Sequence, residues 1–497
     1  MSTEIVIDVQ GYTTRVAVLE NKRLVELFVE DEENPPVIGN IYKGVVKNIF
    51  PGMEAAFVDI GLGKNAFLYL RDLSFGEEMV DELMETSLEE GFDPEEVRTN
   101  LSVKSVPQIG QEMLLQVVKE ALGNKGVKVD SHITLAGRYL VLTPTTRRIG
   151  VSRRITSEEE RSRLEKIMEG LAPPKMGLIA RTNATGKDGA YFENELKILL
   201  NRWHKIKRYS KKASSGSLIY KELPLPLRVI RDIFTEQDRI IINSPEYYQR
   251  IIEFMEELQL GYLQAQVSLD EEDKEIFGRL GIESEIAKAL SRKIWLKCGG
   301  YILIDELEAL VAIDVNSGKY TGSKDPEKTI LKVNLEAAKE VADQLRLRNL
   351  GGIIIVDFIN MEQEKSQKRL MATLEKELSR DRVRYHLLPL TPLGLVEITR
   401  KKSTPSLDEL LCQDCPTCHG GGRVLSLKLL ESRLISRIRN KVKRADEEFL
   451  IKFNPEVCRE LRKSKKIQEL EEDLKIKIEF SPDEELNWNE MEILYRV

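Results

Sequence analysis

The sequence predicts a multidomain protein that combines α/β modules with a small β-barrel. Its 497 residues, at about 100–200 residues per domain, indicate roughly three to five folding units. Short strand-like segments broken by glycines fill residues 37–70 and are typical of a barrel. Between 299 and 358 the order strand, strand, long helix, strand is typical of an α/β module with a crossover helix.

Each element follows from a local pattern. Apolar β-type runs at 4–9 and 14–19 flank a turn at Gly11, which predicts an N-terminal hairpin. In the α/β module, YILID and EALVAID predict two strands, residues 327–348 a long helix, and GIIIVDF a third strand. The remaining expected elements are β-type segments at 113–119, 132–143 and 239–243, helices at 156–170, 190–212, from Pro245 and at 424–445, and a small α/β unit over 450–497.

Composition excludes several classes of protein. The 75 Lys and Arg against 82 Asp and Glu exclude a uniformly basic nucleic-acid coat but allow a local basic surface. Residues 76–97 hold ten acids and no Lys or Arg, which predicts a solvated insertion rather than an RNA-binding face. No secretory signal and no run near the ~18 apolar residues of a membrane span are visible, so we expect a soluble, cytoplasmic protein.

Two aspartates end apolar runs in the α/β module. Asp314 follows ALVAI and Asp357 follows GIIIV, and ligands gather at the carboxyl ends of strands in open α/β sheets. With Asn316 two residues on, they form a set of oxygen ligands suited to Mg²⁺. One such acid alone would more often start a turn or cap a helix. Two in one module favour a metal site that could activate water near a phosphoryl group.

Three cysteines crowd into the segment CQDCPTCHGGG. The Cys415-Pro-Thr-Cys418 knuckle with following glycines indicates zinc, which takes four ligands. Either Cys412 and His419 complete the site locally, or two chains each contribute Cys415 and Cys418. An iron–sulfur site would need a fourth nearby Cys, which the sequence lacks.

Other residues are of types that can contact the bases and phosphates of RNA. Phe57 and Phe67 lie on neighbouring strand-like pieces of the barrel, where aromatic side chains can stack on bases, although an aromatic residue in a strand more often lies in the core. The 202–212 segment has six basic residues and no acid, which fits contacts to a nucleic-acid backbone or a solvated face. Arg181 and Thr182 together suit an anion pocket.

With these residues the chain resembles the ribonuclease E/G family of bacterial endoribonucleases, and its length suits the short, ribonuclease G type. The resemblance covers roughly residues 1–425. It is carried by VIGNIYKGVV, EAAFVDIG, GLIART, AIDVNS, NLEAA, QLRLRNLGGIIIVDFINM, GLVEITRKK and CPTCHGGG.

The resemblance implies a particular architecture. An RNase H-like subdomain holds an inserted OB-fold barrel and 5′-end sensor, followed by a DNase I-like catalytic subdomain, a zinc link and a small C-terminal α/β domain. The implied bounds are 1–36 with 227–290 for the RNase H-like part, 37–131 for the barrel with its acidic insertion, 132–226 for the sensor, 291–411 for the catalytic part, 412–424 for the zinc link and 425–497 for the C-terminal domain.

The resemblance also implies an activity and its residues. It implies an Mg²⁺-dependent endoribonuclease that cuts single-stranded, AU-rich RNA to 5′-phosphate and 3′-hydroxyl ends in rRNA and tRNA processing and mRNA decay, stimulated by a substrate 5′-monophosphate. By position, Asp314 and Asp357 match the Mg²⁺ ligands and Asn316 their hydrogen-bonding partner. The other implied site residues are Phe57, Phe67 and Lys125 for RNA, Gly137, Val141, Arg181, Thr182 and Arg384 for the 5′-phosphate, Arg153 as their support, and Cys415 and Cys418 for a zinc shared by two protomers of a homodimer or tetramer.

Two alternative functions stay open at this point. One is a non-catalytic RNA-binding scaffold, which the intact Asp314, Asn316 and Asp357 set disfavours. The other is an RNase H-type nuclease centred on Asp8, which lies where a catalytic acid of that fold would fall.

Overall fold

The computed structural model divides the chain into two compact units, Met1–Leu410 and Leu411–Val497. The structure describes residues 3–70, 107–120, 126–270, 275–319, 325–402, 404–418 and 420–496. The acidic segment 76–97, Lys125 and His419 lie outside these ranges. Within the described residues, none of the helices is both long and apolar enough to cross a membrane.

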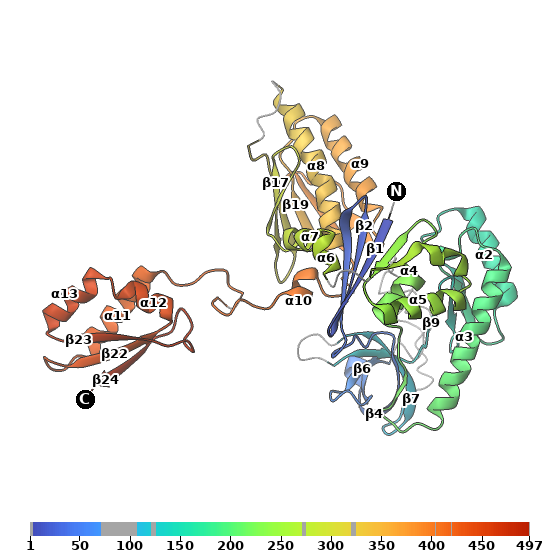
Figure 1. Cartoon of the computed structure of the whole chain (residues 1–497), viewed down its shortest axis with the longest axis horizontal. Coiled ribbons are helices and arrows are strands. Elements are labelled where there is room, and N and C mark those ends of the chain that lie inside the picture. Colours follow the sequence, from blue (N-terminus) through green and yellow to red (C-terminus); the bar gives the residue numbers. More distant parts are fainter. Residues whose placement is uncertain are drawn as a thin grey trace. The chain divides into compact units, whose positions relative to one another are not determined.

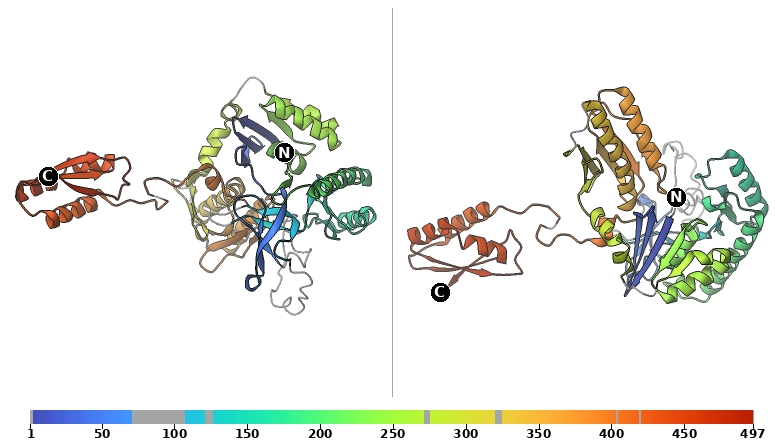
Figure 2. Two further views of the ribbon diagram at one scale, coloured as in Figure 1. Left: turned by 90° about the horizontal axis from the view of Figure 1, so that it is seen from below. Right: turned by 45° about the horizontal axis from the view of Figure 1, so that its top comes forward.

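The first sheet joins the N-terminal hairpin to a segment far along the chain. Its strand order is β15-β14-β1-β2-β3, with β1, β2 and β3 antiparallel and β14 and β15 parallel to β1. The strands are β1 (Thr3–Gln10), β2 (Thr13–Glu20), β3 (Arg23–Asp31), β14 (Arg239–Ile242) and β15 (Val267–Leu269). The helical segments around it are α4 (Leu225–Asp232), α5 (Pro245–Glu257), η5 (Gly261–Gln266), α6 (Ile276–Arg279) and α7 (Ile282–Ala289). Figure 2 shows the blue hairpin beside the light-green helices.

The second sheet closes into a five-stranded barrel. Its order β4-β5-β6-β8-β7 returns to β4 through a β4–β7 pairing, and β13 adds to β4 from outside the ring. The elements are β4 (Ile41–Phe50), η1 (Pro51–Met53), β5 (Ala55–Asp59), β6 (Ala66–Tyr69), β7 (Glu112–Lys119), β8 (Lys128–Asp130) and β13 (Leu218–Tyr220). Small and branched side chains such as Ala56, Val58 and Leu68 fill its interior. A closed ring leaves few exposed edges, as expected for a barrel.

The third sheet has four strands in the order β11-β12-β10-β9 and packs against two helices. The elements are β9 (Leu135–Ala136), β10 (Leu140–Thr143), β11 (Ile149–Val151), α2 (Glu158–Leu171), β12 (Gly177–Ala180), η4 (Thr182–Ala184) and α3 (Gly189–Ser210). The apolar face of α3 carries Phe192, Leu199 and Trp203 into the core beneath this sheet.

The fourth sheet is the expected α/β module. Its order is β16-β17-β18-β19-β21-β20, and α8 crosses from β18 to its parallel neighbour β19. The elements are β16 (Lys293–Trp295), β17 (Tyr301–Glu306), β18 (Val311–Asn316), α8 (Pro326–Leu347), β19 (Gly352–Asp357), α9 (Glu364–Leu378), β20 (Tyr385–Leu387), β21 (Leu395–Arg400) and α10 (Leu407–Leu411). Figure 1 shows α8 and α9 side by side over one face of β17 and β19. We call the opposite face of this sheet the open face.

Ion pairs fasten α8 to the first sheet. Arg346, whose side chain is only 6% exposed, binds Glu20 at 3.0 Å and Glu26 at 2.9 Å. Arg23 of β3 binds Glu340 and Asp343 of α8, each at 2.6 Å. A buried arginine with two carboxylate partners is costly to break because either partner would be left charged and unpaired. These ion pairs link the fourth sheet to the first.

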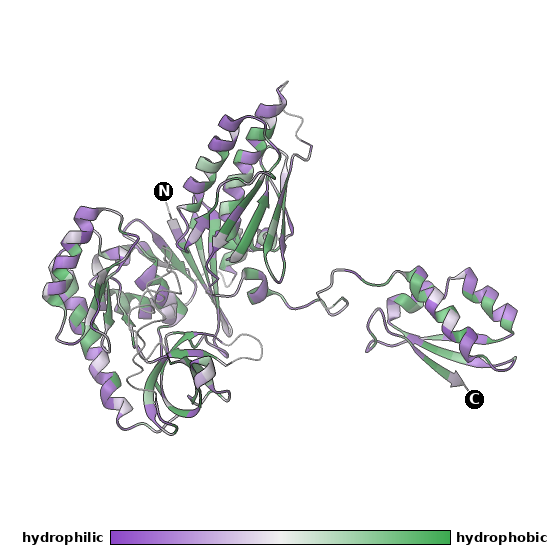
Figure 3. Ribbon diagram, turned by 180° about the vertical axis from the view of Figure 1, so that it is seen from behind, coloured by the Kyte–Doolittle hydropathy of each residue, from purple (hydrophilic) through white to green (hydrophobic). Residues whose placement is uncertain are grey.

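The second unit is a small α/β fold. Its sheet has the order β23-β22-β24 and a core of Leu430, Leu434, Phe449 and Ile451 among others. The elements are α11 (Leu427–Lys441), β22 (Glu448–Phe453), α12 (Pro455–Leu461), α13 (Lys465–Leu474), β23 (Lys477–Pro482) and β24 (Glu492–Arg496). Figure 3 shows hydrophobic strands and helices that are hydrophobic on one side in this unit.

The structure confirms the expected mixture of α/β modules and a barrel. The hairpin, the crossover helix and both helices of the third sheet form close to their predicted positions. Sequence analysis missed α4, which begins among prolines. Pro226 lies in its first turn, where a missing N–H costs no intrahelical hydrogen bond.

Candidate functional site

The two aspartates predicted to bind metal lie side by side. Asp314 and Asp357 are register partners on the parallel strands β18 and β19. Neighbouring strands are about 4.8 Å apart, and register partners point to the same face of the sheet. Both side chains are exposed, whereas Ile313 and Val356 beside them enter the core under α8 and α9. The carboxylates therefore share the open face.

Asn316 orients one of these carboxylates. Its Nδ2 donates a hydrogen bond of 2.7 Å to Oδ2 of Asp314. The two residues are two positions apart on β18, so both side chains lie on the open face. Oδ1 of Asp314 and the carboxylate of Asp357 have no hydrogen-bond donor among the described residues. These oxygens are available to a hard cation, which prefers carboxylate and water ligands.

The donor set fits Mg²⁺ better than a softer metal. Among the described residues, no group of three or more His, Cys, Asp and Glu gathers at a point that could hold a metal. Two carboxylates at an exposed strand end suit Mg²⁺, which is often bound through one or two carboxylates and retains several waters. Zinc, by contrast, is usually held by three or four protein ligands.

Asp8, the acid of the RNase H-type alternative, is enclosed. Its side chain is fully buried, and Nη2 of Arg15 binds Oδ2 at 2.5 Å. Nδ2 of Asn243 donates to its other oxygen, Oδ1, at 2.7 Å. With both oxygens engaged by protein groups, this carboxylate serves to join β1 to the residue that follows β14.

A row of aromatic side chains lies on the outside of the barrel. Phe57 and Phe67 are register partners on β5 and β6, with ring centroids 5.7 Å apart. Both are half-buried and lie outside the barrel core, contrary to the common position of an aromatic residue in a strand. The row continues to Phe50, whose ring centroid lies 5.4 Å from that of Phe57, and to Tyr69, whose ring centroid lies 4.6 Å from that of Phe67. Lys128 Nζ lies 4.6 Å from the Tyr69 ring centroid.

Sequence analysis missed the two ends of this row. The signal for Tyr69 was available, because it follows Phe67 by two positions and so shares its face of the strand. Phe50 ends a different strand, β4, and only the pairing of β4 with β5 brings it to the row. The predicted partner Lys125 lies outside the described residues.

Four of the residues predicted for a 5′-phosphate pocket meet on the third sheet. Val141 of β10 and Ile179 of β12 are register partners, and Arg181 and Thr182 directly follow β12. Arg181 Nη1 donates to the carbonyl oxygen of Gly137 at 2.5 Å. The Thr182 hydroxyl lies 3.2 Å from the hydroxyl of Ser152, which brings the segment containing Arg153 next to the pocket.

A buried carboxylate shapes the turn that contains Gly137. Glu195 of α3 accepts hydrogen bonds from the backbone N–H groups of Arg138, Tyr139 and Leu140 at 2.5, 2.8 and 2.8 Å. A Cβ at residue 137 would lie only 2.5 Å from the carboxylate carbon of Glu195, so glycine is required there. Burial raises the pKa of Glu195, and the three N–H groups act in the opposite direction.

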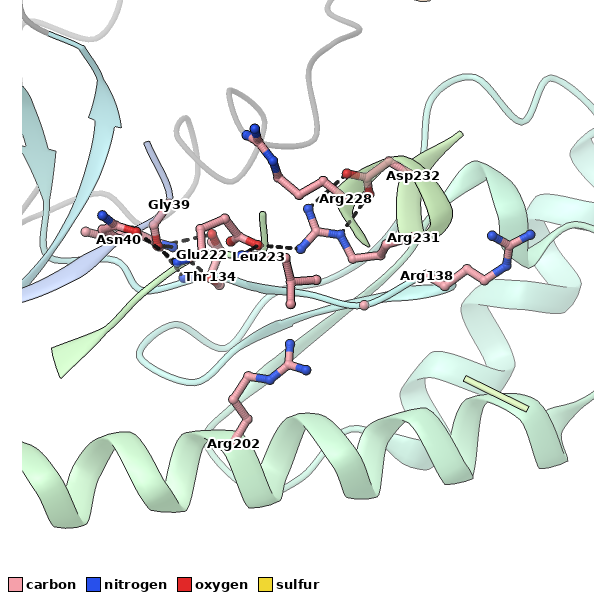
Figure 4. A network of polar contacts seen from close by, with 12 residues as sticks. Gly39, Asn40, Thr134, Arg138, Arg202, Glu222, Leu223, Arg228, Arg231 and Asp232 are labelled. Atoms are coloured by element: carbon pink, nitrogen blue, oxygen red, sulfur yellow. Dashed lines mark hydrogen bonds and ion pairs between the residues drawn. The ribbon is translucent and has the colours of Figure 1, made fainter. Parts of the chain in front are cut away.

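Arg181 belongs to a chain of ion pairs. Asp232 binds Nη1 of Arg181 at 2.6 Å and Nη2 of Arg231 at 2.9 Å, and Arg231 also binds Glu222 at 2.7 Å. Figure 4 shows Arg231 between Glu222 and Asp232. The charges of Arg231 and Arg181 hold the pKa of Asp232 below its usual range, although burial acts the other way and is the largest effect. Since only Nη1 is used, the Nε–Nη2 edge of Arg181 has no partner among the described residues.

Further arginines lie around this pocket. Burial lowers the pKa of Arg154, and the positive charges of Arg382 and Arg181 lower it further. Arg384 is half-buried and follows Arg382 by two residues, just before β20. This places the segment of the fourth sheet that contains Arg384 near the third sheet. Sequence analysis missed Arg154 and Arg382, because only the fold brings their charges together.

The cysteine knuckle in the second unit forms a turn in which backbone N–H groups contact the sulfurs of Cys415 and Cys418. Backbone N–H groups of Cys418 and Thr417 lower the pKa of the Cys415 thiol, and thiolate is the form that binds zinc. The N–H of Gly422 donates to Sγ of Cys418 at 3.3 Å. Cys412 is exposed and, within the described part of the chain, joins no three-residue metal group with this pair.

Comparison with known proteins identifies the family of this chain. Residues 134–403 match the Ribonuclease E/G family. Ribonuclease G of Salmonella typhimurium is 38% identical over 467 residues, which cover 93% of both chains. Ribonuclease G of Haemophilus influenzae is 38% identical over 92% of this chain and 91% of its own. Ribonuclease E of Synechocystis is 36% identical over 83% of this chain and 60% of its own. The chain therefore belongs to the ribonuclease E/G family of metal-dependent ribonucleases and is an endoribonuclease, a hydrolase that acts on phosphodiester bonds of RNA.

Proposed function

We propose that this endoribonuclease cuts single-stranded RNA with Mg²⁺ held at Asp314 and Asp357, and leaves 5′-phosphate and 3′-hydroxyl ends. The observation that carries the proposal is the register of β18 and β19, which sets two exposed carboxylates side by side. When bound there, Mg²⁺ would lower the pKa of a water ligand and neutralise charge on the scissile phosphate.

The protein groups have separate roles in this scheme. Asp314 and Asp357 hold the cation, and Asn316 fixes the orientation of Asp314 through its hydrogen bond to Oδ2. The helices α8 and α9 cover only the far face of the sheet, so a strand of RNA can reach the carboxylates from the open face. Asp8 has both oxygens engaged by Arg15 and Asn243, which argues against the RNase H-type alternative.

We propose that the barrel grips the RNA through Phe57 and Phe67, with Lys125 contributing by resemblance. Half-buried rings on the outside of a small barrel can still stack on successive bases, and stacking tolerates different sequences. The preference for AU-rich segments, and roles in rRNA and tRNA maturation and mRNA decay, are parts of the same proposal that the resemblance implies.

We further propose that a 5′-monophosphate stimulates cleavage by binding beside Arg181 and Thr182. The free Nε–Nη2 edge of Arg181 suits two phosphate oxygens, and Thr182 beside it is an exposed residue with a hydroxyl. The resemblance also assigns Gly137, Val141 and Arg384 to this pocket, with Arg153 as their support. Arg382 and Arg181 add positive charge beside Arg154, partly offset by two nearby carboxylates, and this supports an anion at this place.

For the assembly we propose a homodimer in which two chains share one Zn²⁺ through Cys415 and Cys418; a tetramer is the other state to test. Two thiolates supply only half of the four ligands of zinc, which supports sharing between two chains. We also retain the subdomain bounds implied by the resemblance. The strand order β3-β2-β1-β14-β15 supports an RNase H-like part, and the closed five-stranded ring supports an OB-like barrel.

The deciding experiment is cleavage of a short, 5′-monophosphorylated, AU-rich RNA with and without EDTA, using Asp314→Asn and Asp357→Asn. We expect both variants to lose cleavage and to keep RNA binding, measured by fluorescence anisotropy in EDTA, because the barrel and the basic surfaces are unchanged. Asp305→Asn, which alters an exposed carboxylate paired with Arg292 on the same sheet, is the matched control and should retain activity. Cleavage that persists in EDTA, or variants that lose binding together with cleavage, would contradict the metal assignment.

A further inference from the structure

An exposed aromatic cluster lies at one end of the open face. It consists of Lys293 and Trp295 of the edge strand β16 and Tyr301 of β17. Trp295 is 58% exposed and Tyr301 is half-buried, whereas Ile294 beside Trp295 is buried against α8. Large exposed aromatic residues on a sheet face mark interaction sites when they form a cluster.

The three side chains form a compact stack. The rings of Trp295 and Tyr301 are 5.3 Å apart at an interplanar angle of 64°. Lys293 Nζ lies 4.0 Å from the centroid of Trp295 and 3.7 Å from that of Tyr301. No carboxylate among the described residues pairs with Lys293. Its charge is therefore held at the rings by cation–π attraction and is available to an anion.

The cluster is in line with the candidate metal site. Trp295 is the register partner of Tyr301, and Tyr301 is the register partner of Asn316. Two strand spacings, about 10 Å, therefore separate Trp295 from Asn316 across the sheet. Asn316 is hydrogen-bonded to Asp314. A nucleotide next to a phosphate held at the two aspartates can reach these rings.

We propose that Trp295 and Tyr301 form a stacking platform for one base of the RNA beside the cut, with Lys293 against the adjoining backbone phosphate. This inference rests on the proposed metal site at Asp314 and Asp357. Single-stranded RNA is the occupant that fits, since base stacking on aromatic rings combined with a lysine is how proteins hold unpaired strands. The platform is separate from the aromatic row on the barrel, because it belongs to the sheet that carries the acids.

The test uses a 5′-monophosphorylated RNA with a single cut site and an abasic residue placed at each position in turn. In the wild-type enzyme, one position beside the cut should show a loss in kcat/KM on the order of tenfold, the usual effect of one stacked base. In Trp295→Ala, an abasic residue at that position should cause no additional loss in kcat/KM, because the ring on which the base stacks is absent. Tyr12→Ala, which removes a 67% exposed aromatic at the β1–β2 turn, should keep the wild-type profile.

A second measurement does not depend on cleavage. Binding of a short unmodified RNA in EDTA should quench the fluorescence of Trp295, and the quench should be lost in Trp295→Phe. Trp203 is only 5% exposed and remains as a reporter of the fold. Trp295→Phe keeps an aromatic ring and should retain most of the abasic profile.

The outcomes separate the two proposals. If Asp314→Asn still cleaves, the metal site is wrong. If Asp314→Asn is inactive but abasic losses are the same in wild type and Trp295→Ala at every position, the platform is wrong and the metal site stands. If Trp295→Ala alters the oligomeric state without changing the abasic profile, the cluster is a protein contact and the platform proposal falls.

Discussion

Replacing Arg181 with glutamine tests the 5′-phosphate pocket most directly. The variant removes the Nε–Nη2 edge proposed to hold two phosphate oxygens. Each charge-assisted hydrogen bond contributes about 1.5–3 kcal/mol. The side chain is 26% exposed, so we expect solvent screening to reduce the sum for both bonds to about 1.5–3 kcal/mol. That corresponds to a ~10- to 150-fold loss in kcat/KM for 5′-monophosphorylated RNA.

The fold should tolerate this change. In the variant, Asp232 remains paired with Arg231. Arg231 donates from Nε to Oδ1 of Asp232 at 3.0 Å and from Nη2 to Oδ2 at 2.9 Å. The carbonyl of Gly137 loses its side-chain donor, which lowers the free energy of unfolding by about 1 kcal/mol. A thermal melt should therefore stay cooperative with a small decrease in Tm.

The assay compares one RNA with a 5′-monophosphate, a 5′-hydroxyl or a 5′-triphosphate. We expect Arg181→Gln to slow the monophosphorylated RNA to the rate of the hydroxyl form and to leave the hydroxyl rate nearly unchanged. Arg250→Gln, at a 41% exposed arginine of α5, is the matched control and should change neither rate. An equal decrease for both RNAs in Arg181→Gln would refute the pocket and show that Arg181 serves general RNA affinity.

Three further predictions concern zinc and stability. Cys415→Ser with Cys418→Ser should release zinc and convert dimers to monomers, measured by metal analysis and light scattering; one zinc per protomer in the wild type would instead indicate a local site. Glu195→Gln should lower the free energy of unfolding by about 2–4 kcal/mol, because its amide cannot accept three buried N–H groups, and an unchanged Tm would contradict this. Hydrogen bonds from Arg163 and the Gly186 N–H lower the pKa of Glu160 to about 2 from 4.5, so its ionised form stabilises the fold above pH 4.5 and this contribution is lost as the pH falls towards 2. Glu160→Gln should therefore flatten the Tm profile over that pH range, and a profile parallel to the wild type would count against the assignment.

Much of the architecture was visible in local patterns. The β-branched runs before Asp314 and Asp357 predicted strands. The long helix between them predicted a parallel crossover, because such a helix returns the chain to the end of the sheet where the first strand began. The Cys415–Cys418 knuckle was equally local. In each case the residues that determine the feature are neighbours in sequence, so periodicity and spacing were sufficient.

Local patterns along the chain are therefore enough to predict most strands and helices, the two acids at strand ends and the family resemblance. Which side chains meet depends on the folded structure. It set Asp314 beside Asp357 in register, turned Phe57 and Phe67 outward, engaged Arg181 with Asp232, and placed Trp295 in line with Asn316. These relations depend on strand pairing and on packing between segments far apart in the chain. Spacing along one strand shows which residues share a face, but only the pairing of strands shows which faces and neighbours come together.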